Sequence, residues 1–506
     1  MKTKSINHKK YFPNYTEIKR VGVLGTTLFV SILCIMSCKK FLEIPPPTTQ
    51  LVTASVFNND AAASSAVTDI YTQMFKYDLS YDMANDNGLL ADELQNHSTA
   101  SQGAVFAYFT NGMTNSQAVY GDWQVYYNYS IYSANAVIAG LKQYSGTSPA
   151  VKQQLMGEAY FIRAFCYFNL TNCYGAVPLA LTTDYTINEK LARTPRVQVL
   201  QQVISDLQTA QGMLRTNYVD ASDTLTTTDR VRPTKAVAAA LLARAYLYLG
   251  DYNQNNTGDY QAAIAASSSV ISNSTYSLCA NLSGANSVFL KNSTEAIWQL
   301  YTPLPASYDT YDGNQFVLLA AANINQSTIS RQLLNAFETG DKRQTNWIGT
   351  LTINGTTYFF PYKYKNNTYK GQEYTMMLRL AEQYLIRAEA EAELGQTANA
   401  VADLNVIRNR AGLSNYAGAT DKASLLTAIQ HERQVELFTE WGHRWFDLNR
   451  AVNTASTINV NTVLGSPGNV CQTKGGIWSS DGHQQLYPIP ISDIQKDPNL
   501  TQNPGY

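Results

Sequence analysis

Charged residues are scarce in this sequence, and neither sign dominates. Asp, Glu, Lys and Arg together make up 15% of the 506 residues, the formal net charge is −1, and 45% of the residues are hydrophobic. A nucleic-acid-binding surface needs a basic face that neutralises phosphates. The composition therefore predicts a globular protein without a nucleic-acid partner.

Cysteine is also scarce, with six residues in the chain. Cys166 and Cys173 lie in one helical pattern, about 10 Å apart at the rise of an α-helix, which is too far for a disulfide. Cys279 and Cys471 could pair in an oxidising compartment, and the sequence leaves this open. A disulfide-built scaffold is not expected.

The short motifs of common catalytic sites do not stand out. The sequence shows no Gly-x-Ser-x-Gly turn, Walker loop or dinucleotide-binding glycine pattern. His431-Glu432 resembles the start of a zinc-protease helix, but Val435 stands where the second histidine is needed. We therefore predict no cofactor, no metal ligand and no catalytic residue, although the sequence does not settle whether a metal ion assists binding.

Long hydrophobic runs are confined to the N-terminus. A basic segment, 1–20, is followed by the apolar run 21–36, which is shorter than the ~20 residues that span a bilayer and is typical of a secretory signal peptide. The run ends in Ile35-Met36-Ser37-Cys38, which resembles a lipobox. The alternative is an uncleaved membrane anchor with an incidental cysteine.

A lipobox implies that residues 1–37 are removed and that Cys38 is lipidated. Several acyl chains, at ~0.8 kcal/mol per buried CH₂, anchor a protein stably. Residues 38–50 include Pro45-Pro46-Pro47 and are predicted to form an extended linker. Residues 51–506 are then expected to form a single domain.

Helical periodicity is the strongest pattern in this domain. Residues 233–250 and 374–395 are Ala/Leu-rich and end in Gly250 and Gly395, which suit C-caps. Each is followed by a partner helix with Ala263 or Ala400 five residues after a glycine, a spacing similar to tetratricopeptide helix hairpins. Further helices are predicted over 54–76, 120–142, 150–174, 196–215, 328–338 and 422–441.

Long aromatic and polar stretches separate these helices, at 77–119, 216–230, 273–327, 343–372 and 452–484. Such lengths exceed ordinary loops, so an irregular second lobe is expected to carry function. The 34 Tyr residues suit partly wet contact surfaces, or they replace Phe in a polar core.

Several sequence fragments follow one another in a recognisable order. They are Cys38-Lys-Lys-Phe-Leu-Glu; Trp123, Tyr127, Ile131 and Asn135; Glu158-Ala-Tyr-Phe-Ile-Arg163-Ala164 through Tyr174-Gly175-Ala-Val-Pro178; Lys235-Ala236 through Leu249-Gly250; Arg379-Leu-Ala-Glu382 through Ala388-Glu-Ala390; Asn405-x-x-Arg408-x-Arg410-Ala-Gly412; Glu432-Arg433-x-x-Glu436-Leu437; Gly442-His443-Arg444-Trp445-Phe446-Asp447-Leu448; Leu486-Tyr-Pro-Ile-Pro490; and Gln502-Asn-Pro-Gly-Tyr506. Together these fragments resemble the SusD/RagB family of outer-membrane nutrient-binding lipoproteins.

The resemblance implies a mainly α fold: a tetratricopeptide-like helix-pair array, an α-α superhelix, with a loop-rich irregular second lobe. The repeats are placed at about 54–76, 120–272 and 374–450, and the variable ligand-facing segments at 77–119 and 273–372. The resemblance also implies a lipid-anchored, surface-exposed outer-membrane protein that passes oligosaccharides to a SusC-like TonB-dependent transporter. Some relatives handle peptides instead.

The charged residues of the motif region are better explained by structure than by catalysis. Glu432, Arg433 and Glu436 share one helix face, where arginine forms forked hydrogen bonds to carboxylates, and Arg444 and Asp447 repeat the pattern. A glycosidase pair would have to flank an open cleft. A surface glycoside hydrolase and a tetratricopeptide adaptor for a protein partner remain the alternatives.

Sugar binding requires aromatic faces beside amides and carboxylates. The two variable stretches supply both. We predict ligand contacts from region and chemistry at Asp92, Asn96, Phe106, Tyr108, Phe109, Tyr120, Tyr301, Tyr308, Tyr311, Asn314, Phe316 and Trp347.

Overall fold

The computed structural model describes residues 53–97, 103–115, 120–320 and 327–506. The predicted signal peptide, Cys38 and the linker 38–50 lie outside these residues and stay predictions. The chain divides into Met1–Ser55 and one compact unit, Val56–Tyr506, with α2 (Thr53–Val56) at the boundary. The second unit carries the long helices, the strands and the pockets of the protein.

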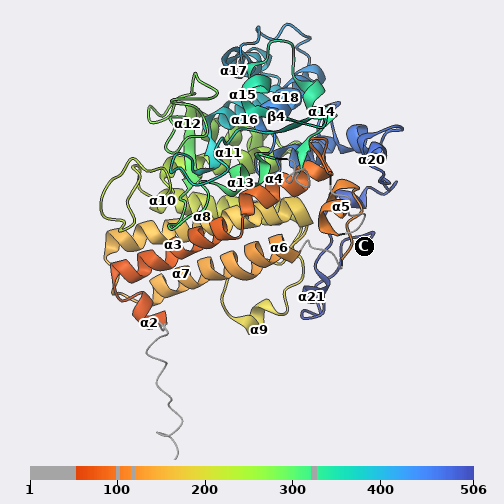
Figure 1. The fold of residues 1–506 in the computed structure, drawn as a ribbon. Helices are drawn as coiled ribbons and strands as arrows, with labels where there is room; N and C mark the ends of the chain where they lie inside the picture. The colour runs from red at the N-terminus through yellow and green to blue at the C-terminus, as the bar shows by residue number, and fades with distance from the viewer. Residues whose placement is uncertain (1–52, 98–102, 116–119, 321–326) are drawn as a thin grey trace, which may run out of the picture. The chain divides into compact units, whose positions relative to one another are not determined.

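Helices dominate this unit, which confirms the predicted mainly α class (Figure 1). In chain order they are α3 (Asp60–Lys76), α4 (Leu79–Leu90), α5 (Ala104–Phe109), α6 (Tyr120–Trp123), the π-helix η1 (Gln124–Ile131), α7 (Tyr132–Gln143), α8 (Pro149–Tyr174), α9 (Tyr185–Asn188), α10 (Arg196–Met213), α11 (Lys235–Tyr252), α12 (Thr257–Ile271), α13 (Tyr311–Phe316), α14 (Arg331–Ala336), α15 (Lys342–Trp347), α16 (Leu380–Glu393), α17 (Thr397–Arg410), α18 (Lys422–Leu437), α19 (His443–Arg450), α20 (Val470–Thr473) and α21 (Ile491–Ile494).

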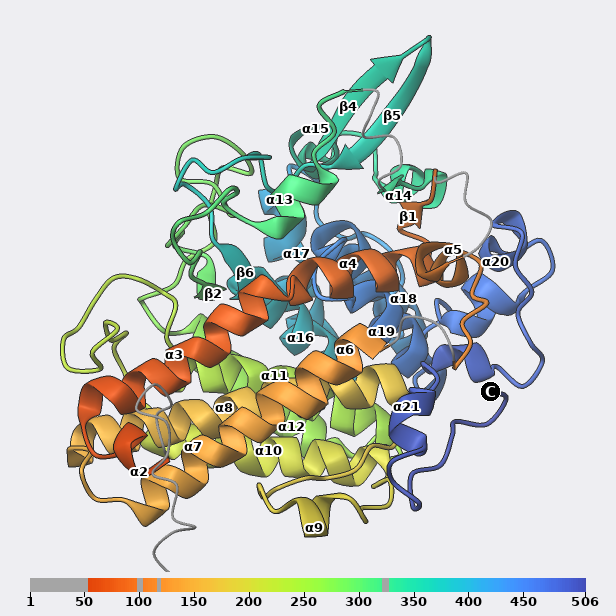
Figure 2. The ribbon, with the colours of Figure 1, turned by 60° about the horizontal axis from the view of Figure 1, so that its bottom comes forward.

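The long helices pack against their sequence neighbours. In turn, α7 packs on α8, α8 on α10, α10 on α11, α11 on α12, α12 on α16 and α16 on α17, and α3 lies beside α7 and α8 (Figures 1 and 2). Side-chain hydrogen bonds cap the N-termini of several helices. At α11 the Thr234 side chain accepts a hydrogen bond from the Val237 amide, and at α18 the Asp421 side chain accepts one from the Ser424 amide. The expected helix pairs α11–α12 and α16–α17 both form. The helical periodicity of the sequence therefore predicted these two pairs correctly.

The two glycines expected as C-caps differ in their roles. Gly395 has φ +72° just after α16, as a left-handed C-cap requires. Gly250 lies inside α11, which continues to Tyr252, so the prediction of a cap there was wrong. A Cβ on Gly250 would lie 2.6 Å from Cε1 of Tyr260. Gly250 is therefore needed for the close approach of α12.

The change Gly250→Ala is expected to destabilise the protein by about 1–3 kcal/mol, because the added methyl group overlaps the buried Tyr260 ring. This loss exceeds the ~1 kcal/mol that Ala gains over Gly in a helix. Gly212 in α10 has open space at its Cβ position, so Gly212→Ala should stabilise. Urea unfolding of both variants measures the difference, and equal midpoints would contradict it.

Three two-stranded antiparallel sheets correct part of the helix prediction. β1 (Leu94–Gln95) pairs with β3 (Thr328–Ile329), β2 (Ala296–Leu300) with β6 (Thr375–Arg379), and β4 (Ile348–Ile353) with β5 (Thr356–Pro361). The predicted helix 374–395 therefore begins only at Leu380, and 328–338 contains a strand before α14. Both β2 and β6 are fully buried, so tertiary pairing overrides the local pattern.

The predicted irregular stretches also contain helices. α4 and α5 lie in 77–119, α13 lies in 273–327, the β4–β5 hairpin lies in 343–372, and α15 overlaps the start of that last stretch. Figure 2 shows this hairpin extending away from the helices. α13 and α15 are short helices whose N-termini are capped by the side chains of Thr310 and Asp341. They are too short to show a helical periodicity in the sequence, so they were not predicted.

A buried charge network crosses the motif region. The Glu436 carboxylate accepts hydrogen bonds from Arg343, Arg379 and Arg410, all almost fully buried. These three guanidinium groups hold the pKa of Glu436 well below its usual range although burial acts in the opposite direction. The network joins α15, β6 and α17 to α18.

Two further arginines pair with carboxylates outside their own sequence motifs or on another helix. Arg433 donates to Asp447 Oδ2 at 2.7 Å, and Arg444 donates to both oxygens of Asp92 at 2.7 Å. The motif carboxylates are therefore structural, as expected, but their partners lie on other elements. Asp92, a predicted ligand contact, is 5% exposed and occupied by this ion pair.

The cysteines of the described residues are all free and buried: Cys166, Cys173, Cys279 and Cys471. The open possibility of a Cys279–Cys471 disulfide is therefore not realised here. Among the described residues, no helix is long and apolar enough to cross a membrane.

Candidate functional site

Five aromatic rings from three segments meet beside the α3–α4 turn. Tyr308 stacks on Phe75, with ring centroids 6.1 Å apart and planes at 24°, and its edge meets Tyr311 at 5.4 Å. Tyr81 on α4 contacts Tyr311 at 5.3 Å and Phe316 at 4.9 Å. We call this group the aromatic site. It joins the two variable stretches of the sequence, since α4 packs against α13 (Figure 2).

Asp309 fixes the loop that carries Tyr308 and Tyr311. Its Oδ1 accepts from the backbone amides of Lys370 and Gly371, and its Oδ2 accepts from those of Gln372 and Glu373, at 2.6 to 3.2 Å. Burial acts to raise the pKa of Asp309, but these amides lower it overall. The carboxylate therefore holds the neighbouring tyrosines in place.

Three carboxylates accompany the rings. Burial, with the charges of Asp82 and Asp312, raises the pKa of Asp78 to about 7. Burial also raises the pKa of Asp82 to about 6 and that of Asp312 to about 7. Within the described residues, Asp78 Oδ1 and Asp312 Oδ2 are buried without a hydrogen-bond partner. The aromatic site is thus acidic, and its carboxylates change their charge close to neutral pH.

Two hollows lie along α3, and the first of them borders the aromatic site. One, of about 460 Å³, lies between Phe75, the segment 303–307 and Tyr308. The other, of about 370 Å³, lies between Tyr71, Asp229 and Tyr301. Thr72 lines both, so they are neighbours on α3, and together, here called the furrow, they offer space for an extended ligand.

The predicted contacts are distributed unevenly around this furrow. Tyr301 is 46% exposed and borders it, and Tyr308 and Tyr311 are half-buried in the aromatic site. Phe316 is 3% exposed and packs against the ring of Tyr81. Asn314 exchanges hydrogen bonds with Asn367, one through each side chain, which braces α13.

The other predicted contacts lie elsewhere. Trp347 is fully buried and donates from Nε1 to the Leu282 carbonyl, while Tyr108 and Phe109 are nearly buried, so these three rings have no face open to a ligand here. Asn96 and Phe106 are half-buried. Tyr120 begins α6, but its side chain lies outside the described residues. As ligand contacts, all twelve residues stay predictions.

Sequence reasoning missed Phe75, Asp78 and Tyr81. Phe75 lay within the predicted helix 54–76, and Asp78 and Tyr81 lay in the stretch 77–119, which was expected to be irregular. Asp78 has φ +54° at the turn between α3 and α4. A left-handed Asp between two helices is a recognisable turn residue, but sequence alone gives no sign that the turn meets Tyr308.

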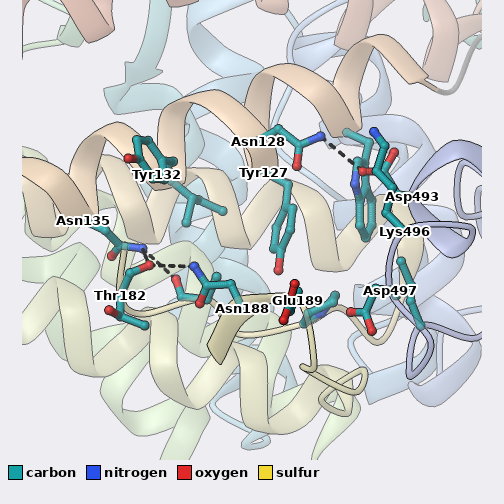
Figure 3. A pocket seen from close by; sticks show the side chains of 15 residues that line it. Tyr127, Asn128, Tyr132, Asn135, Thr182, Asn188, Glu189, Asp493, Lys496 and Asp497 are labelled. Carbon is teal, nitrogen blue, oxygen red and sulfur yellow. Dashed lines mark hydrogen bonds between the residues drawn. The ribbon is translucent and has the colours of Figure 1, made fainter. Parts of the chain in front are cut away.

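A second, separate pocket of about 220 Å³ lies between η1, α9 and α21 (Figure 3). Asn135 and Asn188 donate to backbone carbonyls of the 180–182 segment, and Asn128 donates to Asp493 Oδ1 at 3.3 Å. These bonds join the three walls. The Tyr127 ring stands between them, and its hydroxyl group points toward Glu189 and Asp497.

Across the described ranges, no three His, Cys, Asp or Glu side chains are placed so that they could hold a metal ion.

Two protein-family models match the sequence. One, described as the SusD family, matches residues 310–506, and the other, described as starch-binding associating with outer membrane, matches residues 40–247. SusD-like protein P25 of Formosa agariphila is 24% identical over 557 aligned residues, which cover 95% of this chain and 98% of that protein.

Solved structures share the fold. A surface glycan-binding protein A from Bacteroides uniformis has a TM-score of 0.72 at 20% identity, covering 88% of this chain and 99% of its own. A laminarin-binding SusD-like protein has a TM-score of 0.70 at 22% identity, covering 89% and 100%. At these identities the likeness establishes the helical architecture, and the ligand has to be inferred from the site.

Proposed function

Because this chain belongs to the SusD family, we propose that it is a non-catalytic protein that captures glycans on the aromatic site. The observation that carries this proposal is the pair Tyr308–Tyr311 beside carboxylates and an open furrow. Flat rings offer apolar faces to sugar rings, and carboxylates accept hydrogen bonds from hydroxyl groups. The relatives named for laminarin and surface glycans support the same ligand class.

The proposed setting is the cell surface. Cys38 would carry the lipid anchor, and the linker 38–50 would hold the domain away from the outer membrane. A SusC-like TonB-dependent transporter would receive the glycan. The family description that names outer-membrane association supports this location, and we propose residues 51–506 as the single ligand-binding domain.

A hydrolase is the weaker alternative. Glycoside hydrolysis needs one protonated and one ionised carboxyl group on opposite sides of the bond, so the two pKa values are pushed apart. At the aromatic site the pKa values of Asp78, Asp82 and Asp312 are all raised. Asp309, whose pKa is lowered, is fully buried and accepts hydrogen bonds from four backbone amides, so it is not free to act as a nucleophile, which favours binding over cleavage.

Affinity electrophoresis of the purified lipid-free chain in gels with laminarin, starch or alginate tests the proposal. We expect retardation by a neutral polysaccharide and no reducing ends released from it. Retardation by none of them would contradict glycan binding and favour peptide binding or a protein adaptor. Release of reducing ends that disappears in Asp78→Asn would establish the hydrolase.

The charge of the aromatic site predicts selectivity against anionic glycans. Asp78, Asp82 and Asp312 are largely protonated at pH 5 and ionised at pH 8, since their pKa values are about 7, 6 and 7. Each close like-charge contact costs about 1–4 kcal/mol near a protein surface. Alginate should therefore bind about tenfold more weakly at pH 8 than at pH 5, and laminarin should change little.

The double change Asp78→Asn/Asp82→Asn should flatten this pH profile. High salt should flatten it as well, because ions screen exposed charges. Alginate binding that strengthens as the pH rises would show that the carboxylates do not face the ligand.

A further inference from the structure

A second pair of tyrosines stands at the hollow that Tyr308 does not line. Tyr301 lines this hollow of about 370 Å³ and is 46% exposed. Its ring meets that of the half-buried Tyr374, with centroids 5.5 Å apart and planes at 57°. We call Tyr301 and Tyr374 the second platform. The hollow beside it has the size of a ligand pocket, for which ~300–1,000 Å³ is typical.

The β2–β6 sheet places both rings of the second platform. Leu300 pairs with Thr375 at one end of this antiparallel sheet, and Tyr301 and Tyr374 are the next residues beyond that pair. Side chains at facing positions of two antiparallel strands lie within reach of each other. Because both strands are fully buried, the two rings are mounted on a rigid base.

Asp309 connects the second platform to the aromatic site. Its carbonyl oxygen accepts a hydrogen bond of 2.6 Å from Oγ1 of Thr302, which follows Tyr301. Its carboxylate accepts one of 3.2 Å from the amide of Glu373, which precedes the other ring of the platform. Asp309 itself follows Tyr308 of the aromatic site. The two groups of rings are therefore held in a fixed relation before a ligand arrives.

α3 forms the wall that both groups of rings share. It lies against the β2–β6 sheet (Figure 2), since the Tyr71 ring meets that of Trp298 at 6.2 Å. Thr68 lines the hollow beside the second platform, Phe75 lines the hollow beside the aromatic site, and Thr72 lines both. The seven residues from Thr68 to Phe75 span about 10 Å of α-helix. An extended ligand that follows this stretch of α3 passes both groups of rings.

The polar groups at the second platform suit hydroxyl groups. Arg232 lines the hollow, but its guanidinium group pairs with Glu158 at 3.0 Å and with Asp223 at 2.6 Å, and all three side chains are buried. Asp229 also lines it. One of its oxygens accepts from Asn292 at 2.6 Å, and the other has no hydrogen-bond partner among the described residues. A sugar hydroxyl group can donate to this oxygen, whereas an anionic group would be repelled by it.

We propose that the second platform is a further stacking subsite for a glycan chain held at the aromatic site, so that the preferred ligand is an extended neutral chain reaching from Tyr308 to Tyr301 along α3. This inference rests on the proposed glycan-binding function. The exposed Tyr301 ring offers an apolar face to a sugar unit. Two linked subsites bind a long chain more tightly than either subsite binds a short one.

Isothermal titration calorimetry of the full lipid-free chain with laminaribiose, laminarihexaose, maltose and maltohexaose tests this inference. The change Tyr301→Ala should weaken binding of the preferred hexasaccharide by about tenfold or more and leave binding of the matching disaccharide at the aromatic site unchanged. Tyr301→Phe keeps the ring face and should bind as the wild type does. The control Tyr185→Ala removes a 73% exposed ring of α9 that lines neither hollow.

The outcomes separate this inference from the proposed function. If folded Tyr301→Ala binds the hexasaccharides as tightly as the wild type, or if Tyr301→Phe binds as weakly as Tyr301→Ala, the second platform is overturned while glycan binding at the aromatic site stands. If the wild-type chain binds none of these saccharides, the glycan-binding function is contradicted and the second platform falls with it. Circular dichroism checks that each variant is folded.

Discussion

The change Tyr308→Ala/Tyr311→Ala is expected to abolish retardation by neutral polysaccharides. Tyr308 stacks on Phe75, and Tyr311 meets Tyr81 edge to face, so each ring is held rigidly before ligand arrives. Removing a dominant aromatic contact typically costs about 2 kcal/mol or more of binding free energy, which is about 30-fold in Kd. Each single change should weaken binding by about that factor, and the double change should remove measurable binding.

A matched control comes from another half-buried tyrosine. Tyr416, between α17 and α18, donates its hydroxyl hydrogen to the Ala419 carbonyl. The change Tyr416→Ala removes a similar ring and should leave retardation unaltered. Circular dichroism and melting temperature would confirm that each variant is folded. Undiminished retardation of a folded Tyr308→Ala/Tyr311→Ala protein would show that the glycan binds elsewhere.

The change Glu436→Gln is expected to destabilise the fold by about 3–5 kcal/mol, because breaking a buried ion pair leaves an uncompensated charge in a poorly solvated interior. It removes the charge shared by Arg343, Arg379 and Arg410. Because several elements meet at this carboxylate, the loss should appear as a lower midpoint of global unfolding in urea. Glycan affinity at the aromatic site should persist in the folded fraction.

The control for this prediction is Glu338→Gln. Glu338 pairs with Arg408 at 2.6 Å, but its side chain is 42% exposed, and exposed pairs contribute about 0–1 kcal/mol. The pKa of Glu436 is held well below its usual range. Its stabilising contribution is therefore present above the unfolded pKa of about 4.3 and is lost as the pH falls through the folded value. Equal destabilisation by both variants at pH 7 would contradict the role given to the network.

The sequence was informative wherever a property depends on nearby residues. The Ala/Leu periodicity of α11 and α16 and the cap Thr234 follow from local rules of helix formation. The ordered family motifs indicated the architecture because they cover nearly the whole chain. The interleaving of Glu432, Arg433 and Glu436 also indicated structural ion pairs, although it gave the wrong partners.

Other features depend on residues that are far apart in the chain. Arg444 and Asp92 pair across 352 positions, and β2 pairs with β6 in the core, which turned a predicted helical turn into a strand. Which of the 34 tyrosines remain exposed also depends on residues that are far apart in the chain. Trp347 and Tyr308 looked equivalent in sequence, yet one is fully buried and the other borders a furrow.

The amino-acid sequence by itself determined that this chain forms paired helices of a known family. Helix periodicity depends on residues close together in the chain, and the order of the motifs can be read directly along it. Only the tertiary structure decided which rings and carboxylates come together beside open space. Exposure is a property of packing between distant segments, and neither Tyr81 nor Tyr308 carries a local mark of the aromatic site that it helps to form.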